Sequence, residues 1–233
     1  MRAFLLDVEG TTTPVSFVYD VLFPYARREM AGFLRAHAGE PEVDEALRRL
    51  RDEHRSEGGA PPPWSAEGGI QPALVYLGWL MDADRKSTAL KALQGRVWQE
   101  GFRRGELRGR LYPDVAPALA RWRRQGRSVF IYSSGSVLAQ RLIFSQSEGG
   151  DLSPWIAGYF DTTTGPKRDA ESYRRIAAKI GIDAGDVLFV SDSADEISAA
   201  RDAGLRVALC ARDGAPGTAG PAIRSFDALA PGE

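Results

Sequence analysis

Four short apolar runs constrain most strongly what this chain can fold into. They are AFLL at 3–6, SVFIY at 128–132, DVLFV at 186–190 and LRVALC at 205–210. Apolar runs of this length, bounded by Gly, Asp or Ser, are typical of strands buried on both faces. The segments between the later runs are helical in pattern: Pro113–Gln125 and Asp169–Ile180 each place apolar residues on one face. Alternation of strand and helix predicts a parallel sheet covered by helices.

The stretch after the first run has a different pattern. Between Phe17 and Leu107 the apolar residues recur at helical spacing and no convincing strand is found. The Gly/Pro-rich stretch EGGAPPPWSAEGG at 57–69 cannot sustain a helix and predicts a loop. We therefore predict an α/β core of residues 1–14 and 108–233, interrupted after its first strand by an α-helical cap of residues 15–107.

Composition excludes several classes of function. The 233 residues carry a formal net charge of −1, which does not favour a nucleic-acid partner, so a small-molecule partner is expected. Neither a membrane-length apolar run nor a secretory signal is found, which favours a cytoplasmic protein without membrane contact. The single cysteine, Cys210, is expected in the core. His37 and His54 are expected at solvated surface positions.

Polar and charged residues follow the predicted strands. They are Asp7 and Glu9 after the first run, Ser133, Ser134 and Gly135 after the second, and Asp192 and Asp195 after the third. Lys167 lies in another loop, TTTGPKRDAESY, just before a helix. Because ligands bind at the carboxyl edge of open α/β sheets, we expect these residues to form a phosphate and metal site. In an alternative interpretation, Asp7 and Glu9 are loop carboxylates that cap a helix beginning near Thr12.

Phosphoryl transfer needs this set of residues. Asp7 would be the nucleophile, and Glu9 would protonate the leaving oxygen and later deprotonate the attacking water. Asp7 and Asp192 suit Mg²⁺. Lys167 would supply a fixed positive charge, and Ser133, with the backbone N–H of Ser134 or Gly135, would donate to phosphate oxygens. Asp195 is either an acid favoured at a helix N-terminus or a group that orients Lys167 or a metal-bound water.

These motifs also carry a resemblance. DVEGT at 7–11, SSG at 133–135, Lys167 and SDSADE at 191–196 resemble the four ordered motifs of the haloacid dehalogenase superfamily. With glutamate at position 9 and TTTP after it, DVEGTTTPVSFV resembles the enolase-phosphatase (acireductone synthase) family of the methionine salvage pathway. YSSGSV, GPKRDAESY, SDSADEISAA, ALQGRVWQEGF and LYPDV also fit that family, so the resemblance covers nearly the whole chain.

The resemblance implies a Rossmann-like parallel sheet with an inserted helical cap. It implies conversion of 2,3-diketo-5-methylthiopentyl 1-phosphate to 1,2-dihydroxy-3-keto-5-methylthiopent-1-ene (acireductone) and phosphate by a monomeric, Mg²⁺-dependent enzyme. Asp7 and Asp192 would bind Mg²⁺ through their side chains and Glu9 through its backbone carbonyl. Ser133, Ser134 and Lys167 would hold the phosphate.

Several alternatives stay open at this point. Glu9 is our hypothesis for the base of the enolisation step. The same motifs would serve a phosphatase or phosphomutase for another small phosphate ester. Glu9 and Asp192 argue against a dehalogenase, and retention of Asp7 and Lys167 argues against a catalytically silent binding module. Trp98 and Phe102 are expected in the core of the cap, where an aromatic side chain or Gln94 could also face the substrate.

Overall fold

The computed structural model describes residues 1–65, 69–212 and 222–229. Its chain divides into two compact units, one of Met1–Val18 and Arg108–Glu233 and the other of Tyr19–Leu107. A π-helical segment, η1 (Phe17–Leu22), runs from the first unit into the second. Among the described residues, no helix is long and apolar enough to cross a membrane.

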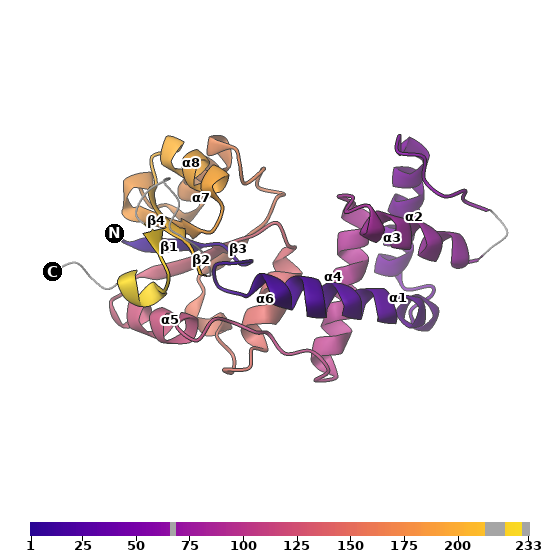
Figure 1. Ribbon diagram of the computed structural model, residues 1–233, viewed down its shortest axis with the longest axis horizontal. Helices are drawn as coiled ribbons and strands as arrows, with labels where there is room; N and C mark the ends of the chain where they lie inside the picture. The colour runs from indigo at the N-terminus through magenta and orange to yellow at the C-terminus, as the bar shows by residue number, and fades with distance from the viewer. Residues whose placement is uncertain (66–68, 213–221, 230–233) are drawn as a thin grey trace. The chain divides into compact units, whose positions relative to one another are not determined.

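The first unit contains a six-stranded sheet in which every pairing is parallel (Figure 1). Its order is β3-β2-β1-β4-β5-β6. The strands are β1 (Ala3–Leu6), β2 (Ser128–Tyr132), β3 (Gly158–Phe160), β4 (Val187–Ser191), β5 (Arg206–Cys210) and β6 (Ala222–Ile223). The four predicted strands are therefore confirmed to within one residue, and the predicted parallel α/β fold is confirmed with them.

Register places the first strand at the centre of the sheet. Leu6 pairs with Ile131 of β2 on one side and with Val190 of β4 on the other. The next residue, Asp7, therefore leaves the sheet at the point where β2 and β4 also end, and the loops after these three strands meet at one edge.

Helices cover both faces of the sheet (Figure 1). They are α5 (Val115–Arg124), α6 (Val137–Ser145), α7 (Ala170–Ile180) and α8 (Ala194–Asp202), with short 3₁₀ turns η2 (Ser153–Trp155), η3 (Ala184–Asp186) and η4 (Phe226–Leu229). Ala3 and Leu5 share a buried cluster with residues of α7 and α8. Phe4, between them, points to the other face and stacks on Trp122 of α5 at a ring-centroid distance of 3.7 Å. This alternation is the period-two pattern of a strand buried on both faces.

The second unit is helical, without a strand among its described residues 19–65 and 69–107. Its helices are α1 (Phe23–Ala36), α2 (Pro41–Ser56), α3 (Gln71–Asp82) and α4 (Thr88–Arg103). Helix α4 packs on α1 and α2, and its residues Trp98 and Phe102 are buried as predicted. The Trp98 Nε1–H donates to the carbonyl of Leu22 at 2.7 Å, which satisfies the polar atom of this buried ring.

Cys210 and the two histidines lie outside the predicted site. Cys210 is buried as expected, and the histidines are half-buried and contact other side chains rather than being fully solvated. The ring of His37 lies between the carboxylates of Glu40 and Glu100, and His54 packs edge-on against Trp64 and Tyr76. Their tertiary partners come from other segments, which the helical pattern around each histidine could not reveal. Residues 66–68, which are part of the predicted loop 57–69, lie outside the described residues.

Candidate active site

A tight loop follows β1 and places the carboxylate of Asp7 at the carboxyl edge of the sheet. The carbonyl of Val8 accepts hydrogen bonds from the N–H groups of Thr11, Thr12 and Thr13, and the Thr12 hydroxyl donates to the carbonyl of Asp7 at 2.9 Å. The helical residues that follow begin at Val15. The carboxylate of Asp7 does not cap them, because its hydrogen bonds go to Val8, Lys167 and Ser191. The interpretation of Asp7 as a helix cap is therefore wrong.

Asp7 is held on two sides. Its Oδ1 accepts hydrogen bonds from Lys167 Nζ at 2.5 Å and from the Val8 N–H at 2.7 Å, and Ser191 Oγ lies 3.2 Å from Oδ2. The residue is only 3% exposed. These contacts fix the carboxylate in one orientation, as a nucleophile requires.

Lys167 lies between two carboxylates. Its Nζ is 2.7 Å from Glu196 Oε2 as well as 2.5 Å from Asp7 Oδ1. Burial lowers the pKa of Lys167, but the charges of Asp7 and Glu196 outweigh burial and raise it. The ammonium group is therefore charged at any physiological pH and supplies a permanent positive charge beside Asp7.

Glu196, not Asp195, contacts Lys167. The predicted role of Asp195 toward Lys167 is wrong, since this side chain is 65% exposed and pairs with Arg168 at 3.4 Å. Glu196 contacts both Lys167 Nζ and, at 2.8 Å, Ser191 Oγ. Ser193 caps α8 and Glu196 stands three residues later, a spacing that predicts a local capping box. In the fold the Glu196 carboxylate points to Lys167 instead.

Asp192 packs against the loop after β1. A Cβ placed on Gly10 would lie 2.1 Å from Asp192 Oδ2, and Gly10 has a φ of +69°. Only glycine combines this left-handed conformation with so close an approach. The sequence Asp7-Val8-Glu9-Gly10 thus brings the end of β1 and the end of β4 into direct contact.

The acids of this cluster perturb one another. Burial and the charge of Asp7 raise the pKa of Asp192 to about 6. Burial and the charge of Asp7 also raise the pKa of Glu9 to about 7, with smaller contributions from Glu196 and Asp192. Such carboxyl groups can carry a proton near neutral pH, which a general acid needs.

These residues fit Mg²⁺. Among the residues that the structure describes, no group of three or more His, Cys, Asp or Glu side chains is arranged to hold a metal by itself. Mg²⁺ usually takes only one or two carboxylates and completes its shell with other oxygens, including water and substrate phosphate. Asp7 and Asp192 are two such carboxylates, and the charge of Asp7 raises the pKa of Asp192. A divalent cation would relieve this repulsion.

The loop after β2 is anchored by side chains and carries the predicted phosphate-binding residues. Ser133 is buried and its Oγ accepts the Gly135 N–H at 2.9 Å, whereas Ser134 is exposed. Gln140 of α6 donates from Nε2 to the carbonyls of Gly135 and Phe160, at 2.9 and 2.8 Å. The loop therefore has a defined conformation at the end of the strand that pairs with β1, just before the N-terminus of α6.

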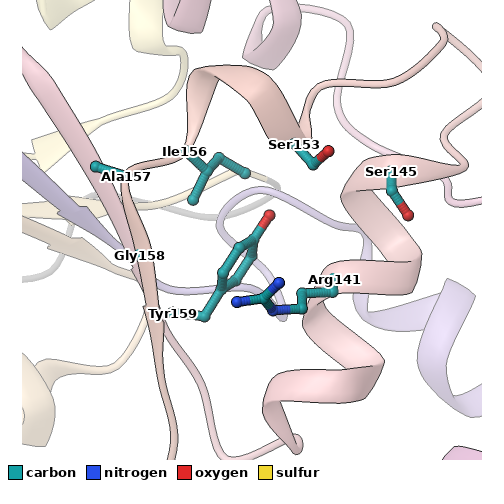
Figure 2. Close-up of a pocket in the computed structure, with 7 residues that line it drawn as sticks. All are labelled: Arg141, Ser145, Ser153, Ile156, Ala157, Gly158 and Tyr159. Carbon is teal, nitrogen blue, oxygen red and sulfur yellow. The ribbon is translucent and has the colours of Figure 1, made fainter.

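A separate surface cavity of about 330 Å³ lies beside the edge strand β3 (Figure 2). Its lining comes from α6, from β3 and from the segment before it, and includes Arg141, whose guanidinium lies 5.2 Å from the ring centre of Tyr159. None of the predicted site residues lines this cavity. Because it contains no carboxylate and no residue of the four motifs, we do not assign the predicted chemistry to it.

Comparison with known proteins is consistent across sequence and structure. Residues 1–204 match the family model of haloacid dehalogenase-like hydrolases. Proteins named enolase-phosphatase E1 are 49% identical in Pseudomonas aeruginosa, over 97% of this chain and 96% of the relative, and 52% identical in Synechococcus elongatus, over 92% and 90%. The crystal structure of the UTR4 protein of Saccharomyces cerevisiae aligns with a TM-score of 0.78 at 32% identity, over 97% of this chain and 98% of that one.

Proposed function

Because this chain belongs to the enolase-phosphatase E1 family of haloacid dehalogenase-like hydrolases, we propose that it converts 2,3-diketo-5-methylthiopentyl 1-phosphate to acireductone and phosphate in methionine salvage. The observation that carries this proposal is the buried contact of 2.5 Å between Lys167 Nζ and Asp7 Oδ1. A buried carboxylate with a permanent cation beside it suits attack on a phosphate dianion, whose charge must be neutralised as the bond forms.

The proposed phosphatase step uses Asp7 and Glu9 in turn. A carboxylate oxygen of Asp7 attacks phosphorus, the bond from phosphorus to the substrate oxygen breaks, and Glu9 gives that oxygen a proton. Water then attacks the aspartyl phosphate, loses a proton to Glu9, and releases phosphate with Asp7 restored. Lys167, the Ser133 hydroxyl and the backbone N–H of Ser134 or Gly135 hold the phosphate oxygens throughout.

We propose the side chains of Asp7 and Asp192 and the backbone carbonyl of Glu9 as ligands of Mg²⁺. When bound, this cation supplies positive charge to the phosphate oxygens and to the enediolate. The contact between Asp192 and the loop at Gly10 supports this assignment, because it brings together ligands from the ends of two neighbouring strands.

Enolisation needs a base near the carbon that bears the phosphate ester, and we propose Glu9. Its side chain is one methylene longer than aspartate and stands two residues after Asp7 in the same loop. Replacement by glutamine keeps the shape and removes the base. We expect Glu9→Gln to stop formation of the phosphorylated enol, as followed by phosphorus NMR. Enol formation at the rate of the unchanged protein would exclude Glu9 as the base.

The proposal extends to domain roles and physiological state. We propose that residues 1–14 and 108–233 form the catalytic core and that residues 15–107 form a cap that supplies substrate contacts. The division of the chain near residues 18 and 107 supports these boundaries. We also propose a cytoplasmic monomer that acts on a small phosphorylated substrate, and light scattering in solution would test the monomer.

The test is anaerobic turnover of the diketo-phosphate with and without Mg²⁺, with phosphate release and the ultraviolet absorbance of acireductone recorded together. We expect both signals to rise, to depend on Mg²⁺ and to disappear in Asp7→Asn. Phosphate release without the enediol absorbance, or from other esters only, would instead support a phosphatase or phosphomutase for a different small ester.

A further inference from the structure

We propose that Tyr132 and Tyr173 are positioning residues that hold Lys167 in its working position through the backbone of residues 165–167. The inference rests on the proposed phosphatase function, in which Lys167 neutralises charge beside Asp7. It assigns a role to two tyrosines that the motifs do not include and that touch no reacting group.

Each tyrosine hydroxyl donates to one end of the segment that carries Lys167. Tyr132 O–H donates to the carbonyl of Gly165 at 2.8 Å, and Tyr173 O–H donates to the carbonyl of Lys167 itself at 2.7 Å. Both residues are 0% exposed. Gly165 and Lys167 are buried as well, so removal of a hydroxyl would take a hydrogen bond from a buried carbonyl, which is costly.

The segment between these two bonds has little regular structure of its own. Residues 165–167 belong to neither a strand nor a helix and lie between β3 and α7. Gly165 has a φ of +149°, and a Cβ there would lie 2.2 Å from Ser172 Oγ. Its neighbour Pro166 has no N–H to donate. Side chains from elsewhere must therefore define where this segment lies.

The two tyrosines come from elements that are themselves fixed. Tyr132 is the last residue of β2, and Tyr173 lies in the first turn of α7. Their rings meet edge-on with centroids 5.5 Å apart, and Tyr173 also packs edge-on against Phe189 of β4. The pair thus ties the Lys167 segment to two strands of the sheet and to one helix.

Tyr132 also contacts the other end of Lys167. Its ring centre lies 5.8 Å from Lys167 Nζ, within reach of a cation–π contact. The ammonium group already lies 2.5 Å from Asp7 Oδ1. A displacement of about 1 Å in a reacting arrangement can reduce turnover by roughly a hundredfold, so small movements of this backbone matter.

The first experiment compares Tyr132→Phe and Tyr173→Phe with Tyr159→Phe. Tyr159 is a matched control, because its hydroxyl is buried and has no hydrogen-bond partner among the described residues. We expect kcat for the diketo-phosphate to fall about tenfold in the first two variants, with KM changed less than about twofold, since Lys167 acts on charge that develops in the transition state. Kinetics within twofold of Tyr159→Phe for both variants would overturn the inference.

A second experiment asks whether the tyrosines act through Lys167. Orthovanadate is titrated calorimetrically into the Mg²⁺-loaded protein, into each phenylalanine variant, and into the same variants combined with Lys167→Ala. We expect each tyrosine change to weaken binding at least threefold when Lys167 is present and to have no further effect when it is absent. Equal weakening in both backgrounds would show that the tyrosines act by another route.

The vanadate titration needs no turnover, so it distinguishes failure of the proposed function from failure of the inference about the tyrosines. If the unchanged protein does not turn over the diketo-phosphate, the proposed function fails and the vanadate titration still tests the inference. If one variant does not fold, as judged by its circular dichroism, the other carries the test.

Discussion

At the scale of single residues, the site gathers several carboxyl groups around one lysine. Asp7 and Glu196 both contact Lys167 Nζ, and burial together with the charge of Asp7 raises the pKa of Glu9 and Asp192. Such a cluster is stable only if each contact is kept, because an unpaired charge in a buried site is costly.

The first prediction distinguishes two adjacent acids. Glu196→Gln removes a carboxylate 2.7 Å from Lys167 Nζ, whereas Asp195→Asn changes an exposed side chain that pairs with Arg168. We expect kcat to fall about 10- to 100-fold in Glu196→Gln, as when the orientation of a catalytic group is lost. Asp195→Asn should stay within about twofold of the unchanged protein, as expected for an exposed ion pair. Steady-state kinetics test this, and equal effects of the two changes would contradict it.

A second residue-scale prediction concerns Gly10. In Gly10→Ala the new methyl group would meet Asp192 Oδ2, and φ of +69° adds backbone strain. We expect at least about a hundredfold loss of kcat/KM because Asp192 must move. Gly39→Ala is the control, since Gly39 has φ of +87° with open space around it. It should cost only about 1–2 kcal/mol of stability, measured by urea unfolding, and leave turnover unchanged. Full activity of Gly10→Ala would show that Asp192 is dispensable.

At the scale of elements, one histidine joins three helices of the second unit. His37 follows α1, and its ring nitrogens lie 2.6 Å from Glu40 Oε1, just before α2, and 3.0 Å from Glu100 Oε2 in α4. Hydrogen bonds to these carboxylates raise the pKa of His37 above its ordinary 6.5. Hydrogen bonds to His37 lower the pKa of both glutamates below 4.5.

These pKa shifts make the contribution of His37 to stability depend on pH. A raised histidine pKa stabilises the fold below pH 6.5, and this contribution disappears as pH rises through the folded-state pKa. The glutamates must also be ionised, so the contribution is largest between about pH 5 and pH 6.5. We expect His37→Gln to lower the free energy of unfolding more at pH 6 than at pH 9, measured by urea unfolding. The same loss at both pH values would mean that the histidine contributes only by packing.

At the scale of the whole molecule, two units each bury their own core. In the first, Trp122 and Phe4 stack beneath the sheet, and in the second, Leu50 of α2 is 0% exposed. Two chain crossings near residues 18 and 107 connect them. Separate cores allow each unit to lose structure without the other.

Leu50→Ala tests this independence. Removing a fully buried leucine should destabilise the second unit by about 2–5 kcal/mol. Hydrogen exchange read by mass spectrometry should then show faster exchange in α2 and α4, with the amides of β1 and β4 as protected as before. Loss of protection in both units together would show that the chain unfolds as one cooperative body.

Local sequence patterns were sufficient to predict most of the architecture and the family. The runs that form β1, β2, β4 and β5 are apolar along their length, so burial on both faces was evident without a structure. The motifs after them were sufficient for the family resemblance, which the comparisons confirm. Strands β3 and β6 were missed, because three and two residues carry no period and become strands only by pairing with β2 and β5.

The sequence by itself therefore determined which loops gather at the sheet edge, because parallel strands all end there. Only the tertiary structure decided which side chains touch within that edge. Asp195 and Glu196 are neighbours on α8, and a helix turns about 100° per residue, so the placement of α8 against β4 selects Glu196 to contact Lys167. Tyr132 and Tyr173, which lie in a predicted strand and a predicted helix, donate to the Lys167 segment for the same reason. Contacts between distant segments depend on packing that no local pattern encodes.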